Sequence, residues 1–353
     1  MILHNKPTIG REEIRAIERV LKSGWLAEGK EVKKFEDEFC KYLGWGPGHA
    51  AAFSSGTAAL YVILVSFDIG HRDEVIIPTY VCSAVLNAVY LIGAKPVLVD
   101  INSDDFNISF EETKKKVNVK TKAIIVSHIF GVPTDVDKFI KLDVPIIEDC
   151  AQIIGAKFKG GHLGTFGKAA IFSFYASKLL TTGYGGMIFS KDRNFIKKVK
   201  DFREFDCRGS YKPRFNFQMS DFQAAMGKVQ LKKLPLFLKK RKKIADEYYK
   251  ILPSEKVWPP RNIGNKEPNF FRFLIRTDET IRIKRFLEKK GIKTIIPIET
   301  YELLHRYLGQ DPQKFPVSEK VAKTTLSLPI YPSLTNLEIK KIKSALKEYF
   351  SRK

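Results

Sequence analysis

The sequence predicts an α/β protein whose larger part is a mostly parallel, seven-stranded sheet between helices. Two observations carry this prediction. Short apolar runs rich in β-branched residues recur along the first half of the chain, and helical segments separate them. Such alternation is typical of parallel sheets covered by helices. The expected strands are 50–53, 75–78, 96–99, 123–126, 145–147, 169–174 and 186–190.

Two amphipathic helices are expected before the first strand, the first of them beginning near Gly10. In each, apolar residues recur at helical spacing and therefore fall on one face. The apolar positions are Ile14, Ile17, Val20 and Leu21 in the first helix and Val32, Phe35, Phe39 and Leu43 in the second.

The second half of the chain predicts a smaller α+β domain. A long, Lys- and Arg-rich helical segment runs from about Met219 to Ile251, strand character resumes at 269–275, and further helices follow. The last helix has a capping box, Thr335 with Glu338. We place the domain boundary in the long helical segment, which gives a large domain at 1–235 and a small C-terminal domain at 236–353.

Composition narrows the class of protein. The 353 residues are 44% hydrophobic and 28% charged, as in soluble globular proteins. The chain has no apolar run long enough to span a membrane and no signal peptide at its start, so a cytoplasmic location is expected. The four cysteines form no CxxC pair or His cluster, which predicts reduced thiols and no metal site.

The formal net charge of +22 is compatible with nucleic acid, anionic lipid or small polyanionic substrates as partners. However, the lysines are spread over helical segments such as 232–250, where apolar residues are interspersed, and no nucleic-acid-binding motif accompanies them. We therefore expect neither nucleic acid nor a membrane as a partner.

Three segments carry residues suited to chemistry. In the first, FSSGTAAL (53–60), small residues lead from a strand into a helix, where free N–H groups can bind a phosphate or form an ordinary helix cap. In the second, Asp149 ends a buried strand of IIEDCAQ (146–152), where it can pair with a cation or cap a loop. In the third, Lys178 precedes a glycine-rich turn, which favours a position facing a cleft over a solvated charge.

Together the three segments meet the needs of an enzyme that uses pyridoxal 5'-phosphate (PLP). A Schiff-base lysine must reach the PLP aldehyde, an acid must keep the pyridine nitrogen protonated, and donors must neutralise the phosphate. Lys178, Asp149 and the Ser55-Gly56-Thr57 turn with Ser173 supply one candidate for each role.

The chain also resembles a known family over nearly its whole length. The matching segments, in order, are SGWLAEGKEVKKFEDEF (23–39), SSGTAAL (54–60), DEVIIPTY (73–80), GAKPVLVDI (93–101), FNI (106–108), HIFGVP (128–133), EDCAQIIGA (148–156), SFYASKLLTTGYGG (173–186), QAAMGKVQL (223–231) and TLSLPIYPSLT (325–335). They resemble the DegT/StrS-type nucleotide-sugar aminotransferases, which are fold-type-I PLP transferases. The resemblance implies that fold and a homodimer with shared active sites.

The resemblance also assigns roles position by position. Lys178 matches the PLP lysine and Asp149 the partner of the pyridine nitrogen, and these two are the expected catalytic residues. Gln152 matches the residue beside the phenolic oxygen of PLP. The phosphate cradle matches Gly56, Thr57 and Ser173, and Asn216 matches a residue that reaches the phosphate of the neighbouring subunit.

Several positions depart from the family pattern. Cys82 stands where an aromatic ring usually stacks on the pyridine, which leaves Tyr80 as a candidate to cover the ring face. Tyr184 replaces a common glutamate, and Gln218 a usual arginine. His305 matches a family histidine only loosely, and we expect it to be structural.

The implied reaction transfers an amino group from an amino acid, glutamate by resemblance, to a nucleotide-linked keto-sugar, for cell-surface polysaccharide or related amino-sugar biosynthesis. Two alternatives stay open. One is a PLP-dependent sugar dehydratase, a branch in which histidine replaces the lysine. The other is a regulatory or cell-envelope protein that binds PLP or a sugar nucleotide without turnover. Intact Lys178, Asp149 and Ser173 favour catalysis.

Overall fold

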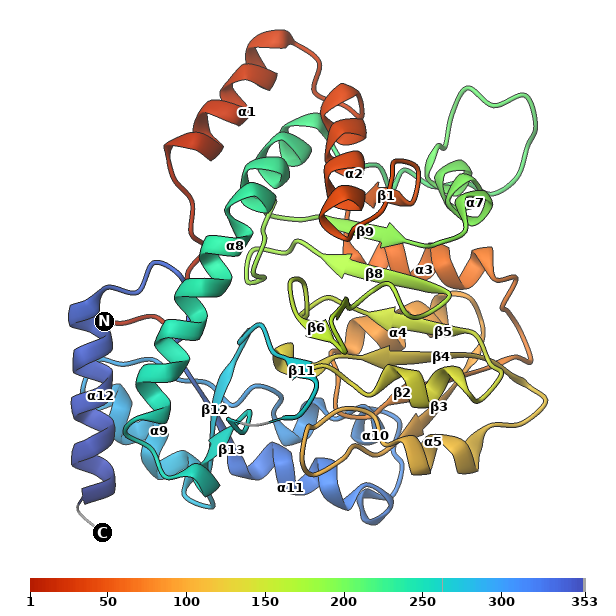
Figure 1. Ribbon diagram of the computed structural model, residues 1–353. Coiled ribbons are helices and arrows are strands. Elements are labelled where there is room, and N and C mark those ends of the chain that lie inside the picture. The colour runs from red at the N-terminus through yellow and green to blue at the C-terminus, as the bar shows by residue number, and fades with distance from the viewer. Residues whose placement is uncertain (262, 352–353) are drawn as a thin grey trace.

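A seven-stranded sheet lies at the centre of the molecule, and the computed structural model describes residues 1–261 and 263–351 (Figure 1). The strand order is β1-β9-β8-β5-β4-β2-β3, and only β9 runs antiparallel to its neighbours. The predicted mostly parallel sheet is confirmed. Its strands are β1 (Ala50–Phe53), β2 (Glu74–Pro78), β3 (Lys95–Val99), β4 (Thr121–Ser127), β5 (Ile146–Asp149), β8 (Ala169–Ser173) and β9 (Gly186–Phe189).

Helices cover both faces of this sheet because its strands are apolar on both sides. Along β1, Ala50 and Ala52 join one apolar core and Ala51 and Phe53 join the other, as the two-residue period of a strand requires. The first core includes α2 (Lys30–Tyr42), α6 (Val136–Ile140) and the first half of α8 (Asp221–Tyr249). The second includes α3 (Gly56–Ser66), α4 (Ser83–Leu91) and α7 (Arg193–Arg203).

A third, smaller core is built from the end of α8 and the chain that follows. It surrounds an antiparallel sheet, ordered β10-β12-β13, and includes residues of α9 and α12. Ile2 also belongs to this core and bridges to Ile292, so the N-terminus returns to the C-terminal part. The boundary at 235/236 stays a prediction, because α8 runs through it. The bounds are β10 (Val257–Trp258), β12 (Phe273–Arg276), β13 (Thr325–Leu328), α9 (Thr280–Lys289) and α12 (Asn336–Ser351).

The remaining elements are short. Residues of β6, β7 and β11 form a small antiparallel sheet beside the main one. At the end of the chain, Thr335 and Glu338 form the predicted capping box ahead of α12, with Thr335 N donating to Glu338 Oε2 over 2.8 Å. The bounds are α5 (Phe110–Lys116), β6 (Lys157–Phe158), β7 (Gly161–His162), β11 (Lys266–Glu267), α10 (Leu304–Tyr307) and α11 (Pro316–Thr324).

The apolar face expected for the first helix, α1 (Arg11–Ser23), is only partly buried, since Val20 is buried and two other positions are not. Ile14 and Leu21 are 61% and 55% exposed. The helix projects from the body of the molecule and contacts α8 through Ala16 and Val20 (Figure 1). A contact with a single neighbouring helix buries only a narrow stripe, so the flanking apolar residues stay outside. The predicted face of α2 is confirmed, since all four of its apolar positions are buried.

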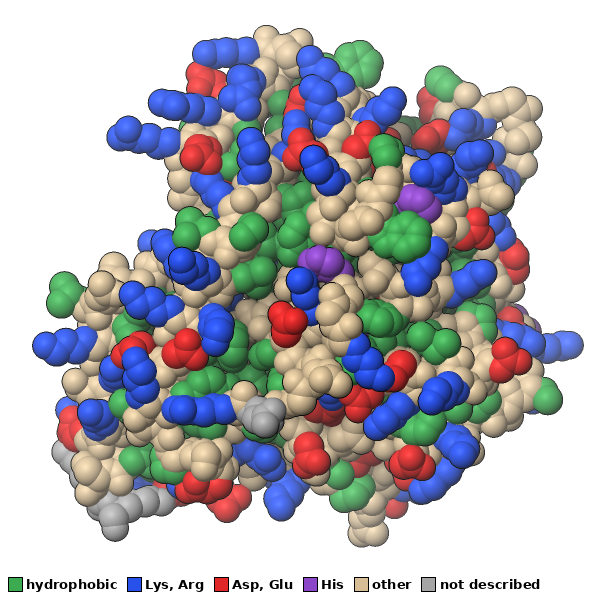
Figure 2. All heavy atoms as spheres, viewed as in Figure 1, with side chains coloured by type: hydrophobic (Ala, Val, Ile, Leu, Met, Phe, Trp, Pro, Cys, Tyr) green, Lys and Arg blue, Asp and Glu red, His purple; other side chains and the backbone are tan. Residues whose placement is uncertain are grey.

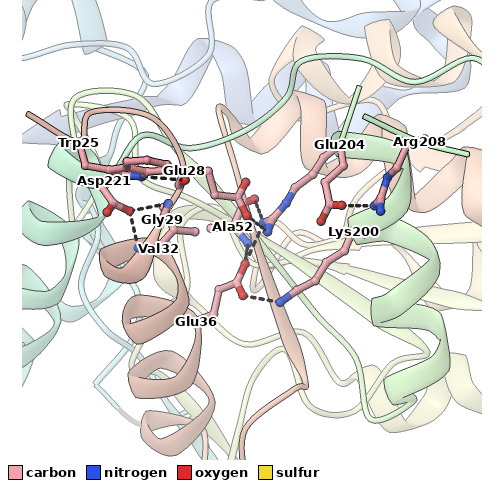
Figure 3. A network of polar contacts seen from close by, with 11 residues as sticks. Trp25, Glu28, Gly29, Val32, Glu36, Ala52, Lys200, Glu204, Arg208 and Asp221 are labelled. Carbon is pink, nitrogen blue, oxygen red and sulfur yellow. Dashed lines mark hydrogen bonds and ion pairs between the residues drawn. The ribbon is translucent and has the colours of Figure 1, made fainter. Parts of the chain in front are cut away.

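A buried ionic network joins α2, β1 and α7 (Figure 3). The Glu36 carboxylate accepts hydrogen bonds from Ala52 N and Arg203 Nη1, both over 2.8 Å, and also pairs with Lys200. Arg203 pairs with Glu28 as well. These contacts hold the first strand in place beside the helix that precedes it and the helix that follows β9.

The surface matches the expectation of dispersed charge. On the face in Figure 2, Lys and Arg side chains are spread over all parts of the molecule rather than gathered in one patch. No helix in the described residues is long and apolar enough to cross a membrane.

Candidate active site

A cavity of about 290 Å³ lies at the edge of the main sheet where β5 ends and the turn into α3 begins. Ligands of open α/β sheets bind at the carboxyl ends of the parallel strands. Six of the seven expected site residues line this cavity: Gly56, Thr57, Asp149, Gln152, Ser173 and Lys178. The structure thus brings together residues up to 122 positions apart in sequence, from Gly56 to Lys178.

The turn into α3 offers free N–H groups to the cavity. The Ser55 side chain caps the helix by accepting a hydrogen bond from Ala58 N, whereas the N–H groups of Gly56 and Thr57 have no acceptor among the described residues. A Cβ atom at Gly56 would lie 3.0 Å from the Cβ of Ser173, so a larger residue here would crowd the Ser173 side chain. Free N–H groups at a helix N-terminus make a phosphate site, and the turn fits one.

Lys178 and Asp149 place opposite charges on the cavity. Burial lowers the pKa of Lys178, and the negative charge of Asp149 opposes that shift. The Lys178 ammonium lies 5.4 Å from the centre of the Phe271 ring. Asp149 is fixed by two hydrogen bonds, from Ser127 Oγ and from Ala151 N, each over 3.0 Å. A buried amine whose pKa is lowered and a fixed carboxylate are groups that proton transfer needs.

Gln152 and Asn216 lie in different surroundings. Gln152 lines the cavity, and its Oε1 accepts a hydrogen bond from Phe130 N over 2.9 Å. Asn216 is exposed, in the segment between α7 and α8, and does not line the cavity of its own chain. The hypothesis that it serves a neighbouring subunit therefore stays a prediction.

Tyr80 does not cover the cavity, contrary to expectation. Its side chain is 1% exposed and packs edge-on against Phe130, at 5.8 Å between ring centres, in an apolar cluster with Trp258. The next two residues, Val81 and Cys82, line the cavity instead. Once buried among aromatic rings at the junction with the smaller core, the Tyr80 ring is not available to a ligand.

His305 lies away from the cavity, as expected of a structural histidine. It is fully buried. Its Nδ1 shares a 2.7 Å hydrogen bond with Thr79 Oγ1, and its Nε2 lies 3.1 Å from Glu319 Oε1. Its ring stacks on Phe315 with 4.4 Å between centres. All its polar atoms are engaged by the protein.

Some lining residues were given no role from the sequence, although Tyr184 was noted as a departure from the family pattern. Tyr175 and Tyr184 both line the cavity, and their rings pack at 5.4 Å. Tyr175 lies within the motif that contains Lys178, so its place in the motif was a usable signal. A second cavity adjoins the first and is lined by Arg272, which no sequence motif marks.

Glu148 belongs to a separate, buried cluster with His128 and Cys150, whose ligand atoms lie within 4.8 Å of one another. Its carboxylate already accepts hydrogen bonds from His128 and from Gly164 N, Phe166 N and Gly167 N. These bonds outweigh burial and lower the pKa of Glu148. Because every acceptor position is used, the cluster has a structural role.

Comparisons with known proteins agree with this site. The model of the DegT/DnrJ/EryC1/StrS aminotransferase family matches residues 7–347. GDP-perosamine synthase of Escherichia coli O157:H7 is 30% identical, covering 99% of this chain and 98% of that protein. The aminotransferase TlmJ from Streptoalloteichus hindustanus is 27% identical with a TM-score of 0.93, covering 100% of this chain and 99% of TlmJ. The PLP form of a protein described as a sugar aminotransferase, Spr1654 from Streptococcus pneumoniae, is 26% identical with a TM-score of 0.91 over 99% of both chains. The chain therefore belongs to the DegT/DnrJ/EryC1/StrS aminotransferase family, whose members are PLP-dependent enzymes.

Proposed function

We propose that this chain binds PLP in the 290 Å³ cavity and transfers an amino group from glutamate to a keto-sugar linked to a nucleoside diphosphate. The observation that carries the proposal is that Lys178, Asp149 and the N–H groups at the start of α3 face one cavity. We also propose that the product serves cell-surface polysaccharide or related amino-sugar biosynthesis. The reaction is assigned to the cytoplasm, since the four cysteines are free, as is usual in a reducing compartment.

Each part of the cofactor has a residue to hold it. Gly56 and Thr57 N–H, with the Ser173 hydroxyl, would bind the phosphate. Asp149 would hold the pyridine nitrogen and Lys178 the aldehyde carbon. Gln152 would lie beside the phenolic oxygen. When bound, PLP withdraws electrons from the carbon that gains or loses a proton.

Lys178 is suited to move that proton between carbons. Burial lowers its pKa, so its amine is neutral in a larger fraction of molecules than a solvated lysine would be. A base with a pKa nearer the working pH combines the correct protonation state with a sufficient driving force. Asp149 keeps its position because Ser127 and Ala151 N hold both of its oxygens.

The choice of a nucleotide-linked keto-sugar as acceptor is supported by the name of a similar enzyme and by the net charge of this chain. The name of the 30% identical GDP-perosamine synthase states a GDP-linked amino-sugar product. A net charge of +22 favours association with an anionic substrate such as a nucleoside diphosphate. The presence of lysine at position 178 disfavours the dehydratase alternative, in which histidine is expected there.

The proposal is tested by borohydride reduction of the PLP-loaded protein followed by peptide mapping. We expect the reduced cofactor on Lys178. Label on Lys168 or Lys191 would contradict the assignment. The protein converted to its pyridoxamine phosphate form by glutamate is then incubated with a panel of nucleotide keto-sugars. Return of the original cofactor spectrum identifies the acceptor, whereas failure of glutamate to convert the cofactor in the first step would favour the non-catalytic alternative.

We propose further that the working unit is a homodimer with shared sites. Apolar side chains on and after α1 lie open to solvent in the single chain, and Asn216 is exposed outside the cavity of its own chain. The exposed apolar residues are Ile14 (61%), Leu21 (55%), Trp25 (61%) and Leu26 (46%). Exposed apolar surface of this kind is typical of an interface between subunits.

Mixing two inactive variants tests the shared site. Lys178→Ala and Asn216→Glu chains are combined and allowed to exchange subunits. If Asn216 acts in the partner, one site of each mixed dimer collects both lesions and the other neither, so activity returns to at most about half of the wild-type value. Absence of recovery despite proven exchange, or full activity of a monomer, would contradict the shared site.

A further inference from the structure

The N-terminal segment, residues 1–9, is anchored to the rest of the protein at both ends. Near its start, Ile2 is buried in the core of the C-terminal part, and its N–H donates a hydrogen bond to Gly291 O over 2.8 Å. Near its end, the Thr8 carbonyl oxygen accepts a hydrogen bond from Gln230 Nε2 of α8 over 2.9 Å. The residues between these two anchors therefore follow a defined path across the molecule.

This path brings the segment to the wall of the second cavity, which has a volume of about 220 Å³. His4 Nε2 accepts a hydrogen bond from Arg272 Nη1 over 3.2 Å. The next residue, Asn5, donates from Nδ2 to Ser177 O over 2.9 Å. Arg272, Ser177 and Lys178 all line this cavity, and Lys178 also lines the proposed PLP cavity. The N-terminal segment thus contacts the chain directly before the proposed PLP lysine.

The peptide group between Ser177 and Lys178 is held by hydrogen bonds on both of its sides. Its oxygen accepts from Asn5 Nδ2, and its N–H donates to Tyr175 O over 2.9 Å. Within residues 1–261 and 263–351, Asn5 is the only donor to this oxygen. Because a peptide group is planar, the two bonds together fix the orientation of the plane from which the Lys178 side chain starts.

The direction of the Lys178 side chain depends on this backbone support. In the part of the chain that the structure describes, the Lys178 ammonium forms no hydrogen bond or ion pair and lies 5.4 Å from the centre of the Phe271 ring. A lysine has many rotamers, and its amine reacts only from those that reach the reacting carbon. Asn5 is not among the residues that line either cavity, so it acts on Lys178 through the peptide group alone.

We propose that Asn5 is a positioning residue for Lys178. Its side-chain amide holds the peptide group before Lys178 so that the amine is directed at the aldehyde carbon of PLP. This inference rests on the proposed function, because it assumes that Lys178 carries PLP. The loss of one hydrogen bond of this kind corresponds to about a threefold to tenfold change in an equilibrium constant.

Two ligands that differ in their ability to react with a lysine test the inference by binding alone. The aldehyde of PLP condenses with a lysine amine, with loss of water, whereas pyridoxamine 5'-phosphate has no aldehyde and binds through its ring and phosphate only. Each is titrated calorimetrically into cofactor-free protein. In Asn5→Leu, which has a side chain of similar size without N–H groups, we expect the Kd of PLP to rise about threefold to tenfold. The Kd of pyridoxamine 5'-phosphate should stay as in the wild type.

Two further variants serve as controls. Asn5→Gln keeps the amide on a longer side chain and should recover part of the lost PLP affinity. Gln230→Met removes the amide that donates to Thr8 O of the same segment, but it leaves the contact between Asn5 and Ser177 in place. It should bind both ligands as the wild type does. Thermal melting of each variant confirms that the compared proteins are folded.

The possible outcomes separate the inference from the proposed function. An unchanged affinity of Asn5→Leu for PLP, or an equal loss for both ligands, would show that Asn5 does not position Lys178. A selective loss of PLP affinity in Gln230→Met as large as that in Asn5→Leu would assign the effect to the order of the whole N-terminal segment and overturn the role of Asn5. If neither ligand bound the wild type, the PLP site itself would be wrong, and the inference would fall with it.

Discussion

Arg203 and Arg272 are two arginines largely withdrawn from solvent, and the protein surrounds them differently. Arg203 is 2% exposed and pairs with two carboxylates, those of Glu28 and Glu36. Arg272 has no carboxylate partner among the described residues and faces a cavity. Each leaves its Nε without a hydrogen bond, so the difference lies in the compensation of charge. A charge with internal partners serves the fold, whereas an uncompensated one beside a cavity is available to a ligand.

The same contrast holds between two consecutive carboxylates. Glu148 accepts hydrogen bonds from His128 and three backbone N–H groups, so its oxygens are saturated by the protein. Asp149, the next residue, accepts only from Ser127 and Ala151 N and lines the cavity. Strand geometry explains the difference, because successive side chains of β5 point to opposite faces of the sheet.

The largest effect on stability is expected for Arg203, the arginine that pairs with two carboxylates. Replacing Arg203 by Met leaves Glu28 and Glu36 without their shared partner, with only Lys200 beside Glu36 (Figure 3). Breaking a buried ion pair costs about 3–5 kcal/mol. We expect the free energy of unfolding, from denaturant titration, to fall by that amount.

The control for this variant is Arg208→Gln. Arg208 pairs with Glu204 near the same network, but both side chains are about a third exposed (Figure 3). Exposed pairs contribute about 0–1 kcal/mol, so this variant should unfold almost as the wild type does. An equal loss of unfolding free energy in Arg203→Met and Arg208→Gln would show that burial does not make the Arg203 pairs more stabilising than the Arg208 pair.

The next effect concerns the two carboxylates of β5. In Asp149→Ala the fold should persist, while amino transfer should fall about 10²–10³-fold, as for the loss of one electrostatic contact in an active site. In Glu148→Gln the damage should instead appear as lower unfolding free energy. The measurements are steady-state rates and denaturant titrations of both variants. Near-normal turnover by Asp149→Ala would mean that another group holds the pyridine nitrogen.

The sequence predicted most of the fold because the strands and helices of the first half have clear local patterns. Each of the seven expected strands is present within a few residues of its predicted bounds. The failure at α1 has a physical cause. The spacing of Ile14 and Leu21 identifies an apolar face, but only the tertiary structure determines which neighbour covers it.

The site was predictable to the extent that its residues lie in motifs. Lys178, Asp149 and the Gly56-Thr57 turn stand at the ends of recognisable strands, and the fold brings them to one cavity. Arg272 was not predictable, since it lies directly before an ordinary strand, and its missing counter-ion is visible only once its neighbours are placed. Tyr80 failed for a related reason, because a motif position does not fix the direction of a side chain.

The smallest expected effect concerns His4, the imidazole that accepts from Arg272. Burial, with the charge of Arg272 second, lowers the pKa of His4 from 6.5 to about 3. In the unfolded chain the histidine regains its ordinary pKa and binds a proton below it. The stability that depends on neutral His4 is therefore complete above pH 6.5 and is lost as the pH falls toward 3.

Unfolding titrations of wild type and His4→Gln at pH 7 and pH 5.5 test this directly. When the pH falls from 7 to 5.5, the free energy of unfolding of the wild type should decrease by about 1 kcal/mol more than that of His4→Gln, since glutamine does not titrate. The pH-dependent loss of unfolding free energy in Arg272→Gln should lie between those of the wild type and His4→Gln. Removing the neighbouring cation makes protonation of His4 less unfavourable, while burial still opposes it. An identical pH dependence in all three proteins would mean that folding does not lower the pKa of His4, so that the imidazole is protonated at pH 5.5 in the folded state as in the unfolded one. Its contact with the Arg272 guanidinium would then be a repulsion, and Arg272 would need an anion nearby even without substrate.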